Sequence, residues 1–133
     1  MIVAVADTHV VVWYLFNNLK LSAVAKETVE SAFRQGHQIG VSSISLVELV
    51  YLVEKGRIPE TAFDLLVHNL ENPAYPFQEI AVDGAIAAQV QQVSRDEIPD
   101  MPDRIVAATG LYHRVPIISR DGKIRAANLR TIW

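Results

Sequence analysis

The first strand of this chain constrains the fold more than any other stretch. Residues Ile2–Ala6 form an unbroken apolar run that is rich in β-branched side chains, and Asp7 follows it directly. A strand that is apolar on both faces is typical of a parallel sheet covered by helices on both sides. Because open α/β folds bind their ligands beyond the carboxyl ends of the strands, Asp7 is the first candidate for a functional side chain.

Strand-like and helix-like segments alternate along the rest of the chain. We expect further strands at residues 39–41, 77–82, 115–119 and 129–133, and helices at residues 8–16, 23–35, 44–55, 59–69, 84–93, 103–113 and 122–128. This alternation predicts a parallel sheet with right-handed crossovers and helices on both faces. No internal repeat or low-complexity segment divides the 133 residues, so we expect one domain spanning 1–133. The helix over 44–55 is apolar almost all round, and we expect it to be deeply buried.

Composition excludes several classes of protein. Half of the residues are apolar, but no apolar run reaches the ~20 residues of a membrane helix. The first 16 residues lack a basic leader and contain Asp7 and His9, so we expect no signal peptide. The chain has no cysteine, which excludes thiolate metal sites and cysteine nucleophiles and fits a cytoplasmic location. The net charge of −3 gives no overall attraction to nucleic acid.

Four acids occupy equivalent places in the predicted framework. Asp7 and Asp121 each follow a strand, whereas Glu48 and Asp103 lie near the start of the helix that comes after a strand or loop. Crossover connections bring all of these places to one edge of the sheet, so the four carboxylates can meet.

Clustered carboxylates repel one another unless a cation neutralises them. Mg²⁺ and Mn²⁺ prefer hard oxygen ligands of this kind. Water on such an ion loses a proton more easily and can attack a phosphodiester, and a second ion about 4 Å away would stabilise the leaving oxygen. The sequence therefore favours a metal-dependent hydrolase of phosphodiester bonds.

Each acid also has a purely structural interpretation. Asp7 could cap the next helix, Asp103 could complement a helix dipole, and Asp121 could belong to an ordinary turn. Glu48 could form a capping box with Ser45. The functional interpretation depends on the agreement of the four positions.

Four segments form an ordered set across the chain: Asp7-Thr8-His9, Ser42–Leu49, Asp100–Thr109 and Ile117–Asp121, with Ile132-Trp133 at the end. Together they resemble the PIN-domain family and, within it, the VapC-type toxin ribonucleases. The resemblance extends over essentially the whole chain. A departure is Gly110 within the helix predicted over 103–113, where glycine costs up to ~1 kcal/mol relative to alanine unless close packing requires it.

The resemblance implies a three-layer α/β/α fold whose five-stranded parallel sheet has the order 3-2-1-4-5, with Asp7 next to Asp121. It implies a Mg²⁺- or Mn²⁺-dependent endoribonuclease that is the toxin of a type II toxin–antitoxin pair, binds a cognate antitoxin and forms a homodimer. Matched position by position, the catalytic and metal-binding residues would be Asp7, Glu48, Asp103 and Asp121. Thr8 and Ser119 would orient carboxylates or a bound water by hydrogen bonding.

Several other side chains are weaker candidates. Arg120, Lys123 and Arg125 lie beside the last acid and could bind the RNA backbone, although solvated surface charge is the alternative for each. Arg104 could bind phosphate or hold Asp100 or Asp103 in place. His9 could contact RNA or a dimer partner, but we favour a partly buried histidine hydrogen-bonded to backbone. Trp13 could form an interface, but we favour core packing for it. The helix pair over 44–69 carries more apolar surface than a sheet face needs, so it is a candidate contact for a second copy or an antitoxin.

Two other functions compete with this prediction. A haloacid-dehalogenase-type phosphatase would carry Asp-x-Asp after the first strand, but His9 occupies the third position. A module that binds RNA or protein without metal would leave the clustered carboxylates uncompensated, which argues against it.

Overall fold

The computed structural model describes residues 1–133, and it contains one parallel sheet of five strands. The strands are β1 (Ile2–Ala6), β2 (Gln38–Ser42), β3 (Phe77–Ile80), β4 (Ile117–Ile118) and β5 (Thr131–Ile132). The helices are α1 (Thr8–Leu15), α2 (Ala23–Arg34), α3 (Ser43–Glu54), α4 (Ala62–Glu71), α5 (Gly84–Val90), α6 (Met101–His113) and α7 (Gly122–Ala126). No helix combines the length and the apolar character that crossing a membrane requires.

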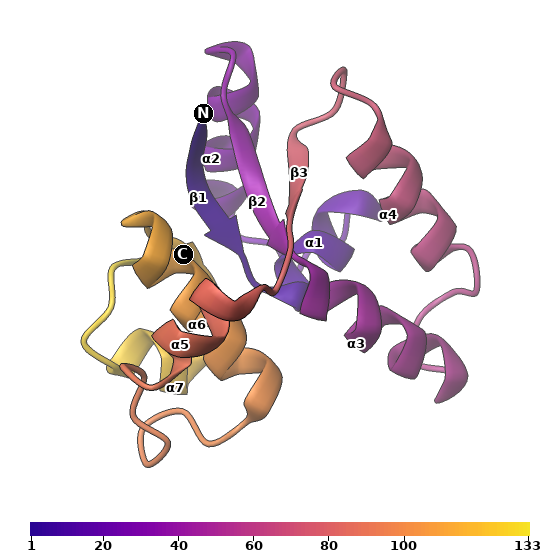
Figure 1. The fold of residues 1–133 in the computed structure, drawn as a ribbon. Coiled ribbons are helices and arrows are strands. Elements are labelled where there is room, and N and C mark those ends of the chain that lie inside the picture. Colours follow the sequence, from indigo (N-terminus) through magenta and orange to yellow (C-terminus); the bar gives the residue numbers. More distant parts are fainter.

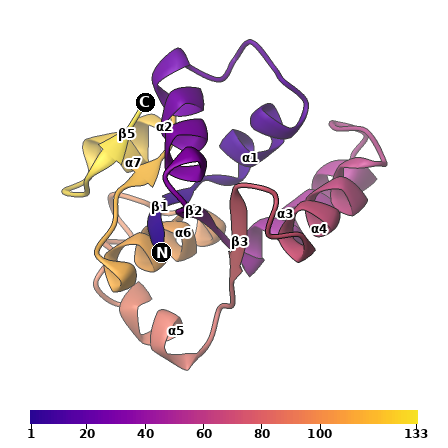
Figure 2. The same cartoon turned by 90° about the horizontal axis from the view of Figure 1, so that it is seen from above.

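The strand order β3-β2-β1-β4-β5 confirms the predicted topology. β1 is the central strand and pairs with β2 on one side and with β4 on the other, both in parallel. Figures 1 and 2 show α2 and α5–α6 on opposite sides of the sheet, while α3 and α4 project together from its β3 side. β2 and β3 lie on one side of β1, and β4 and β5 lie on the other. The carboxyl end of β1 is therefore at the switch point, where such folds place ligands.

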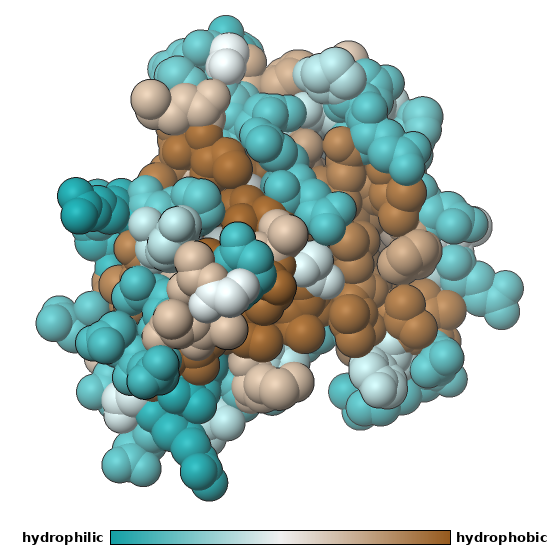
Figure 3. Space-filling view, viewed as in Figure 1, coloured by the Kyte–Doolittle hydropathy of each residue, from teal (hydrophilic) through white to brown (hydrophobic).

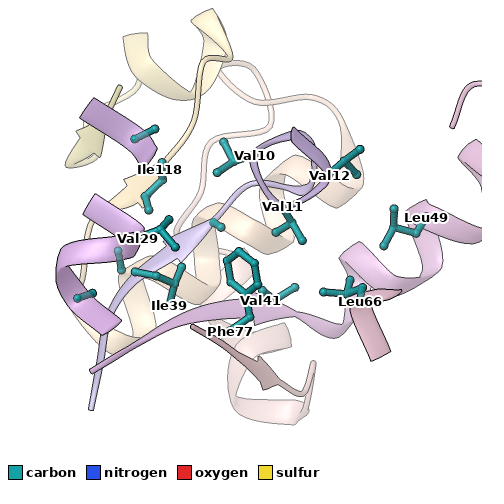
Figure 4. Packing of buried hydrophobic residues seen from close by; sticks show 14 of the residues in the cluster. Val10, Val11, Val12, Val29, Ile39, Val41, Leu49, Leu66, Phe77 and Ile118 are labelled. Atoms are coloured by element: carbon teal, nitrogen blue, oxygen red, sulfur yellow. The ribbon is translucent and has the colours of Figure 1, made fainter. Parts of the chain in front are cut away.

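Alternate residues of β1 belong to two separate apolar clusters, which explains its unbroken apolar run. Ala4 and Ala6 pack with α1, α2 and α4 in the cluster that Figure 4 shows, whereas Val5 packs with α6 and with Ile124 of α7. Because both faces of β1 are buried, neither face can carry polar side chains. The first polar residue, Asp7, therefore comes directly after the strand, at its carboxyl end.

The prediction that the helix over 44–55 is deeply buried is wrong. In α3, only Ser45 and Leu49 are buried, and Val47 and Tyr51 are exposed by 48% and 59%. α3 packs on α4, α6 and α1 near the sheet but extends away from it, so part of its apolar surface stays uncovered (Figure 1). Figure 3 shows apolar residues gathered on this part of the surface.

Several predicted helix boundaries also differ from the structure. α5 ends at Val90 instead of Val93 and α7 at Ala126 instead of Asn128, and two helices begin two or more residues away from the predicted start. α6 begins at Met101 instead of Asp103, because the side chain of Asp100 accepts a hydrogen bond from the Asp103 N–H and caps the helix. α4 begins at Ala62 instead of Pro59, since residues 59–61 form a turn in which the Ala62 N–H donates to the Pro59 carbonyl. The strands after residue 115 are shorter than predicted, with two residues each.

Candidate active site

A cavity of about 330 Å³ opens where β1 and β4 end. All four predicted acids line it. Its lining residues are Asp7, His9, Val10, Trp13, Glu48, Asp100, Asp103, Arg120 and Asp121. The cavity therefore holds five acids from four separate parts of the chain, together with a single arginine and no lysine.

Asp7 is held by the strand next to it. Its backbone N–H donates to the Ile118 carbonyl at 3.0 Å, and the Ser119 hydroxyl donates to its Oδ2 atom at 2.8 Å. Asp7 precedes α1, but its side chain makes no capping hydrogen bond. Asp7 therefore does not cap α1, as the structural interpretation proposed. Its carboxylate is only 6% exposed and accepts its hydrogen bond from Ser119, at the end of the neighbouring strand.

Ser119 links the first and the last acid. Its hydroxyl donates to Asp7, and its oxygen accepts the Asp121 backbone N–H at 3.0 Å. Ser119 is fully buried at the end of β4, so these bonds fix both the Asp7 side chain and the turn that leads to Asp121. The orienting role predicted for this hydroxyl is consistent with these contacts.

Glu48 is held by hydroxyl groups from α1 and α3. The Thr8 hydroxyl donates to Glu48 Oε1 at 2.6 Å, and the Ser45 hydroxyl lies 2.7 Å from the Thr8 oxygen. An ionised carboxylate only accepts, so with Glu48 ionised the order of donation is Ser45 to Thr8 to Glu48. The capping box of Ser45 with Glu48 does not form, because Ser42 caps α3 instead.

Asp103 and Asp121 each occupy the start of a helix. Asp103 lies in the first turn of α6, where Asp100 caps the helix. Asp121 precedes α7 and its Oδ1 atom accepts hydrogen bonds from the backbone N–H groups of Lys123 and Ile124. The capping role of Asp121 and its place in the cavity therefore coexist.

Burial and mutual repulsion make the acids harder to ionise than ordinary carboxyls. Burial raises the pKa of Asp103 to about 7, and the charges of Asp7, Asp100, Asp121 and Glu48 add to the rise. The contribution of four separate charges to the pKa of one carboxyl shows that these groups share one electrostatic environment.

The pKa values of Asp7 and Glu48 shift in the same direction. Burial raises the pKa of Asp7, and the hydrogen bond from Ser119 opposes this rise. Burial likewise raises the pKa of Glu48, where the hydrogen bond from Thr8 opposes it. In the absence of a cation, the cavity therefore binds protons more readily than free carboxyls do.

The donor set of the cavity fits a hydrated divalent cation. Carboxylate oxygens are the hard ligands that Mg²⁺ and Mn²⁺ prefer, and the repulsion among the acids is the energy that a cation would relieve. No three of the histidine and acidic side chains are arranged to hold an ion directly. Mg²⁺ in proteins usually keeps several waters and contacts one or two carboxylates, so acids that reach an ion through water satisfy this requirement.

The four predicted RNA-binding cations are placed very differently. Arg120 lines the cavity, whereas Lys123 and Arg125 are exposed on α7 and do not. Arg104 also lies outside the cavity, and its guanidinium donates to the carbonyls of Val90 and Val93 at 3.1 and 2.9 Å. The fold thus uses Arg104 to attach the end of α5 to α6, which counts against both roles predicted for it.

Four cavity residues were not among the predicted site residues: His9, Val10, Trp13 and Asp100. Asp100 is three positions before Asp103, a spacing that places both at the same end of α6, and this spacing was the available signal. His9 is exposed, so the prediction of a partly buried histidine is wrong. Trp13 is buried as predicted but also lines the cavity, a position that no sequence pattern indicates.

The sequence and the fold match known proteins over nearly their whole length. The family model described as PIN domain matches residues 4–128. Ribonuclease VapC22 from Mycobacterium tuberculosis (strain ATCC 25618 / H37Rv) is 26% identical over 126 residues, which cover 95% of this chain and 92% of that protein.

Solved structures show the same fold. A chain of VapBC2 from Rickettsia felis, bound to a DNA fragment from its promoter, matches with a TM-score of 0.69 and 19% identity, covering 98% of this chain and 97% of that one. A chain of a toxin–antitoxin complex from Klebsiella pneumoniae matches with a TM-score of 0.60 and 25% identity, over 94% and 92% of the two chains. A chain of FitAcB from Neisseria gonorrhoeae has a TM-score of 0.56 and 20% identity, over 96% and 95%.

Proposed function

Because the chain belongs to the PIN domain family, we propose that it is a metal-dependent endoribonuclease and the toxin of a toxin–antitoxin pair. The observation that carries this proposal is the convergence of Asp7, Glu48, Asp103 and Asp121 on one cavity at the carboxyl ends of β1 and β4. The similarity to Ribonuclease VapC22 and to chains of toxin–antitoxin complexes supports the same activity.

We propose Asp7, Glu48, Asp103 and Asp121 as the catalytic and metal-binding residues. A divalent cation, when bound, neutralises these carboxylates and promotes the ionisation of water for attack on a phosphodiester. We propose Mg²⁺ or Mn²⁺ as the ion, in keeping with the divalent-metal dependence that is general in this family. Ser119 holds Asp7 and Thr8 holds Glu48, so two of the four carboxylates have fixed orientations before any ligand arrives.

The experiment that tests this function is cleavage of total RNA by the purified protein. We expect cleavage with Mn²⁺ or Mg²⁺, no cleavage with excess chelator, and loss of cleavage in Asp7→Asn and Asp121→Asn. Mapping of the cut ends identifies the target sequence. If wild-type protein binds RNA but neither cleaves it nor responds to metal, the metal-free binding module is the correct assignment.

The exposed apolar face of α3 supports an interaction with another protein chain. Val47, Val50 and Tyr51 are 48%, 39% and 59% exposed on this helix. We propose that the protein acts in the cytoplasm, is inhibited there by an antitoxin, and forms a homodimer. Light scattering of the isolated protein, and co-purification with the product of an adjacent small open reading frame, test the two partners separately.

A further inference from the structure

The cavity that holds the acids carries one strong cation, and that cation lies on an aromatic ring. The guanidinium carbon of Arg120 is 4.6 Å from the ring centroid of Trp13, and both residues line the cavity. We propose that Arg120, held in place by Trp13, is the phosphate-binding group that positions the RNA backbone against the carboxylates. This inference rests on the proposed ribonuclease function and assigns a substrate-binding role that acids cannot perform.

The need for such a cation follows from charge. Five acids line the cavity, and the whole chain has a net charge of −3. A phosphodiester that approaches the cavity is repelled by the negative charge that a bound divalent cation leaves uncompensated, so a positive group at the cavity edge favours productive binding. Arginine suits this position because its planar guanidinium offers several donors to phosphate oxygens.

The guanidinium of Arg120 has no acidic partner in the protein. The ion pair of this structure joins Arg34 to Glu27, far along the chain from Arg120, and no side-chain hydrogen bond ties Arg120 to the acids around it. Its side chain is exposed, in contrast to Arg104, whose guanidinium donates to backbone carbonyls. Arg120 is therefore the cavity cation whose donors are available to a ligand.

Arg120 is held in place both by its sequence neighbours and by the ring of Trp13. Its neighbours in sequence are Ser119, which is buried and bonded to Asp7, and Asp121, which caps α7. Trp13 is 8% exposed, and its ring also contacts the rings of Trp133 and His9 at centroid distances of 6.0 and 5.7 Å. A buried, packed ring is a fixed platform, and stacking on it reduces the freedom that a long exposed side chain would lose on binding.

The test compares Arg120→Gln with Arg57→Gln, which removes the same charge from an exposed position outside the cavity. Binding of a short fluorescent single-stranded RNA is measured against salt with Ca²⁺ present, and cleavage of total RNA with Mn²⁺. We expect Arg120→Gln to weaken binding about tenfold, the size of one charge-assisted hydrogen bond. The slope of log affinity against log salt should fall by about 0.7, the value for one phosphate contact to a single strand.

Trp13 is tested as a positioning residue through its coupling to Arg120. We expect Trp13→Leu to weaken binding in wild type but to have little further effect in the Arg120→Gln background, while Trp13→Phe retains most of the affinity. The melting-temperature rise with Mn²⁺ should remain in Arg120→Gln, because the carboxylates are unchanged.

The outcomes separate this inference from the ribonuclease proposal. If wild type cleaves RNA but Arg120→Gln binds with the affinity and salt slope of Arg57→Gln, the role assigned to Arg120 is wrong and the nuclease stands. If the effects of Trp13→Leu and Arg120→Gln simply add, the positioning role of Trp13 is wrong. If wild type shows no metal-dependent cleavage, the proposed function itself fails.

Discussion

At the scale of single residues, the central feature is a buried carboxylate that the fold makes costly to ionise. Asp7 is 6% exposed, and burial raises its pKa although Ser119 donates a hydrogen bond to it. A folded protein tolerates such a group where the charge serves a function, because selection for activity then outweighs the lost stability.

Replacement of Asp7 by asparagine separates these two contributions. Asn retains an oxygen that accepts the Ser119 hydroxyl but carries no charge, so we expect Asp7→Asn to melt at a higher temperature than wild type in chelator at pH 8. RNA cleavage should fall more than about 100-fold, since even groups that only orient a metal ligand contribute roughly 10- to 100-fold. Asp96→Asn, which alters an exposed acid outside the cavity, is the control. A variant that melts lower, or that still cleaves RNA, would contradict this account.

The Ser119 hydroxyl supports two groups at once, so its removal should be costly. Ser119→Ala leaves Asp7 Oδ2 and the Asp121 N–H without their partner. We expect a loss of about 1–3 kcal/mol in the free energy of unfolding, measured with denaturant, because unpaired buried polar groups carry a desolvation penalty. Ser94→Ala is the control, since the exposed Ser94 accepts only a long bond of 3.4 Å from the Glu97 N–H. If the two variants were equally stable, Ser119 would not stabilise Asp7 and the turn to Asp121 in the way proposed here.

At the scale of elements, the position of α6 against β4 is set by a glycine. A Cβ atom on Gly110 would lie 2.7 Å from Cγ1 of Ile117 and 3.3 Å from the Val115 carbonyl oxygen. Ile117 is buried in the same cluster as the inner face of α6, so it has little room to move. The mid-helix glycine is therefore explained by close packing, and the helix that carries Asp103 lies directly on the strand that leads to Asp121.

Alanine at position 110 should consequently destabilise the protein despite its better helix propensity. Overpacking costs about 1–3 kcal/mol and the propensity gain is up to about 1 kcal/mol, so we expect Gly110→Ala to lower the free energy of unfolding by about 1–2 kcal/mol. Gly84→Ala, where no atom lies within 4 Å of the new Cβ, should leave stability unchanged or slightly higher. Denaturant unfolding of the pair gives the answer, and a stabilising Gly110→Ala would refute the packing argument.

At the scale of the whole molecule, the acids couple folding, protons and metal. The pKa of Asp103 is about 7 in the folded protein, against its ordinary value of 3.8. Between these values the folded state binds more protons than the unfolded state, so Asp103 makes stability fall as pH rises from about 4 to about 7. Above pH 7 both states are ionised and the loss contributed by Asp103 is complete.

Metal binding should oppose this pH dependence of stability. A cation binds the ionised acids and displaces protons, so its affinity increases as pH passes 7. We expect melting in chelator to occur at a lower temperature at pH 8 than at pH 6, and the rise caused by saturating Mn²⁺ to be larger at pH 8. Differential scanning fluorimetry at the two pH values, with Asp103→Asn for comparison, measures both effects. If Mn²⁺ raised the melting temperature equally at the two pH values, metal binding would not depend on ionisation of these acids, and this account would be wrong.

The sequence by itself determined the fold class and the set of acids, and the resemblance to the PIN-domain family implied the strand order. An apolar run that fills both faces of β1 admits few folds, and alternation of strands and helices then places strand ends at one edge, which predicts where Asp7, Glu48, Asp103 and Asp121 meet. Helix boundaries that depend on a single cap, such as Asp100 before α6, were predicted less well, because several neighbouring polar residues fit the same pattern.

Only the tertiary structure decided which side chains face the cavity and which are used elsewhere. Arg104 and Arg120 look equivalent in sequence, yet one donates to carbonyls at the end of α5 and the other lies over Trp13 at the cavity. Their fates depend on partners distant in the chain, and no local pattern encodes a contact of that kind. The same reason explains why α3, apolar almost all round, keeps part of its apolar surface exposed. The sequence indicates which side chains are apolar, but only the packing of the elements determines which of them are covered.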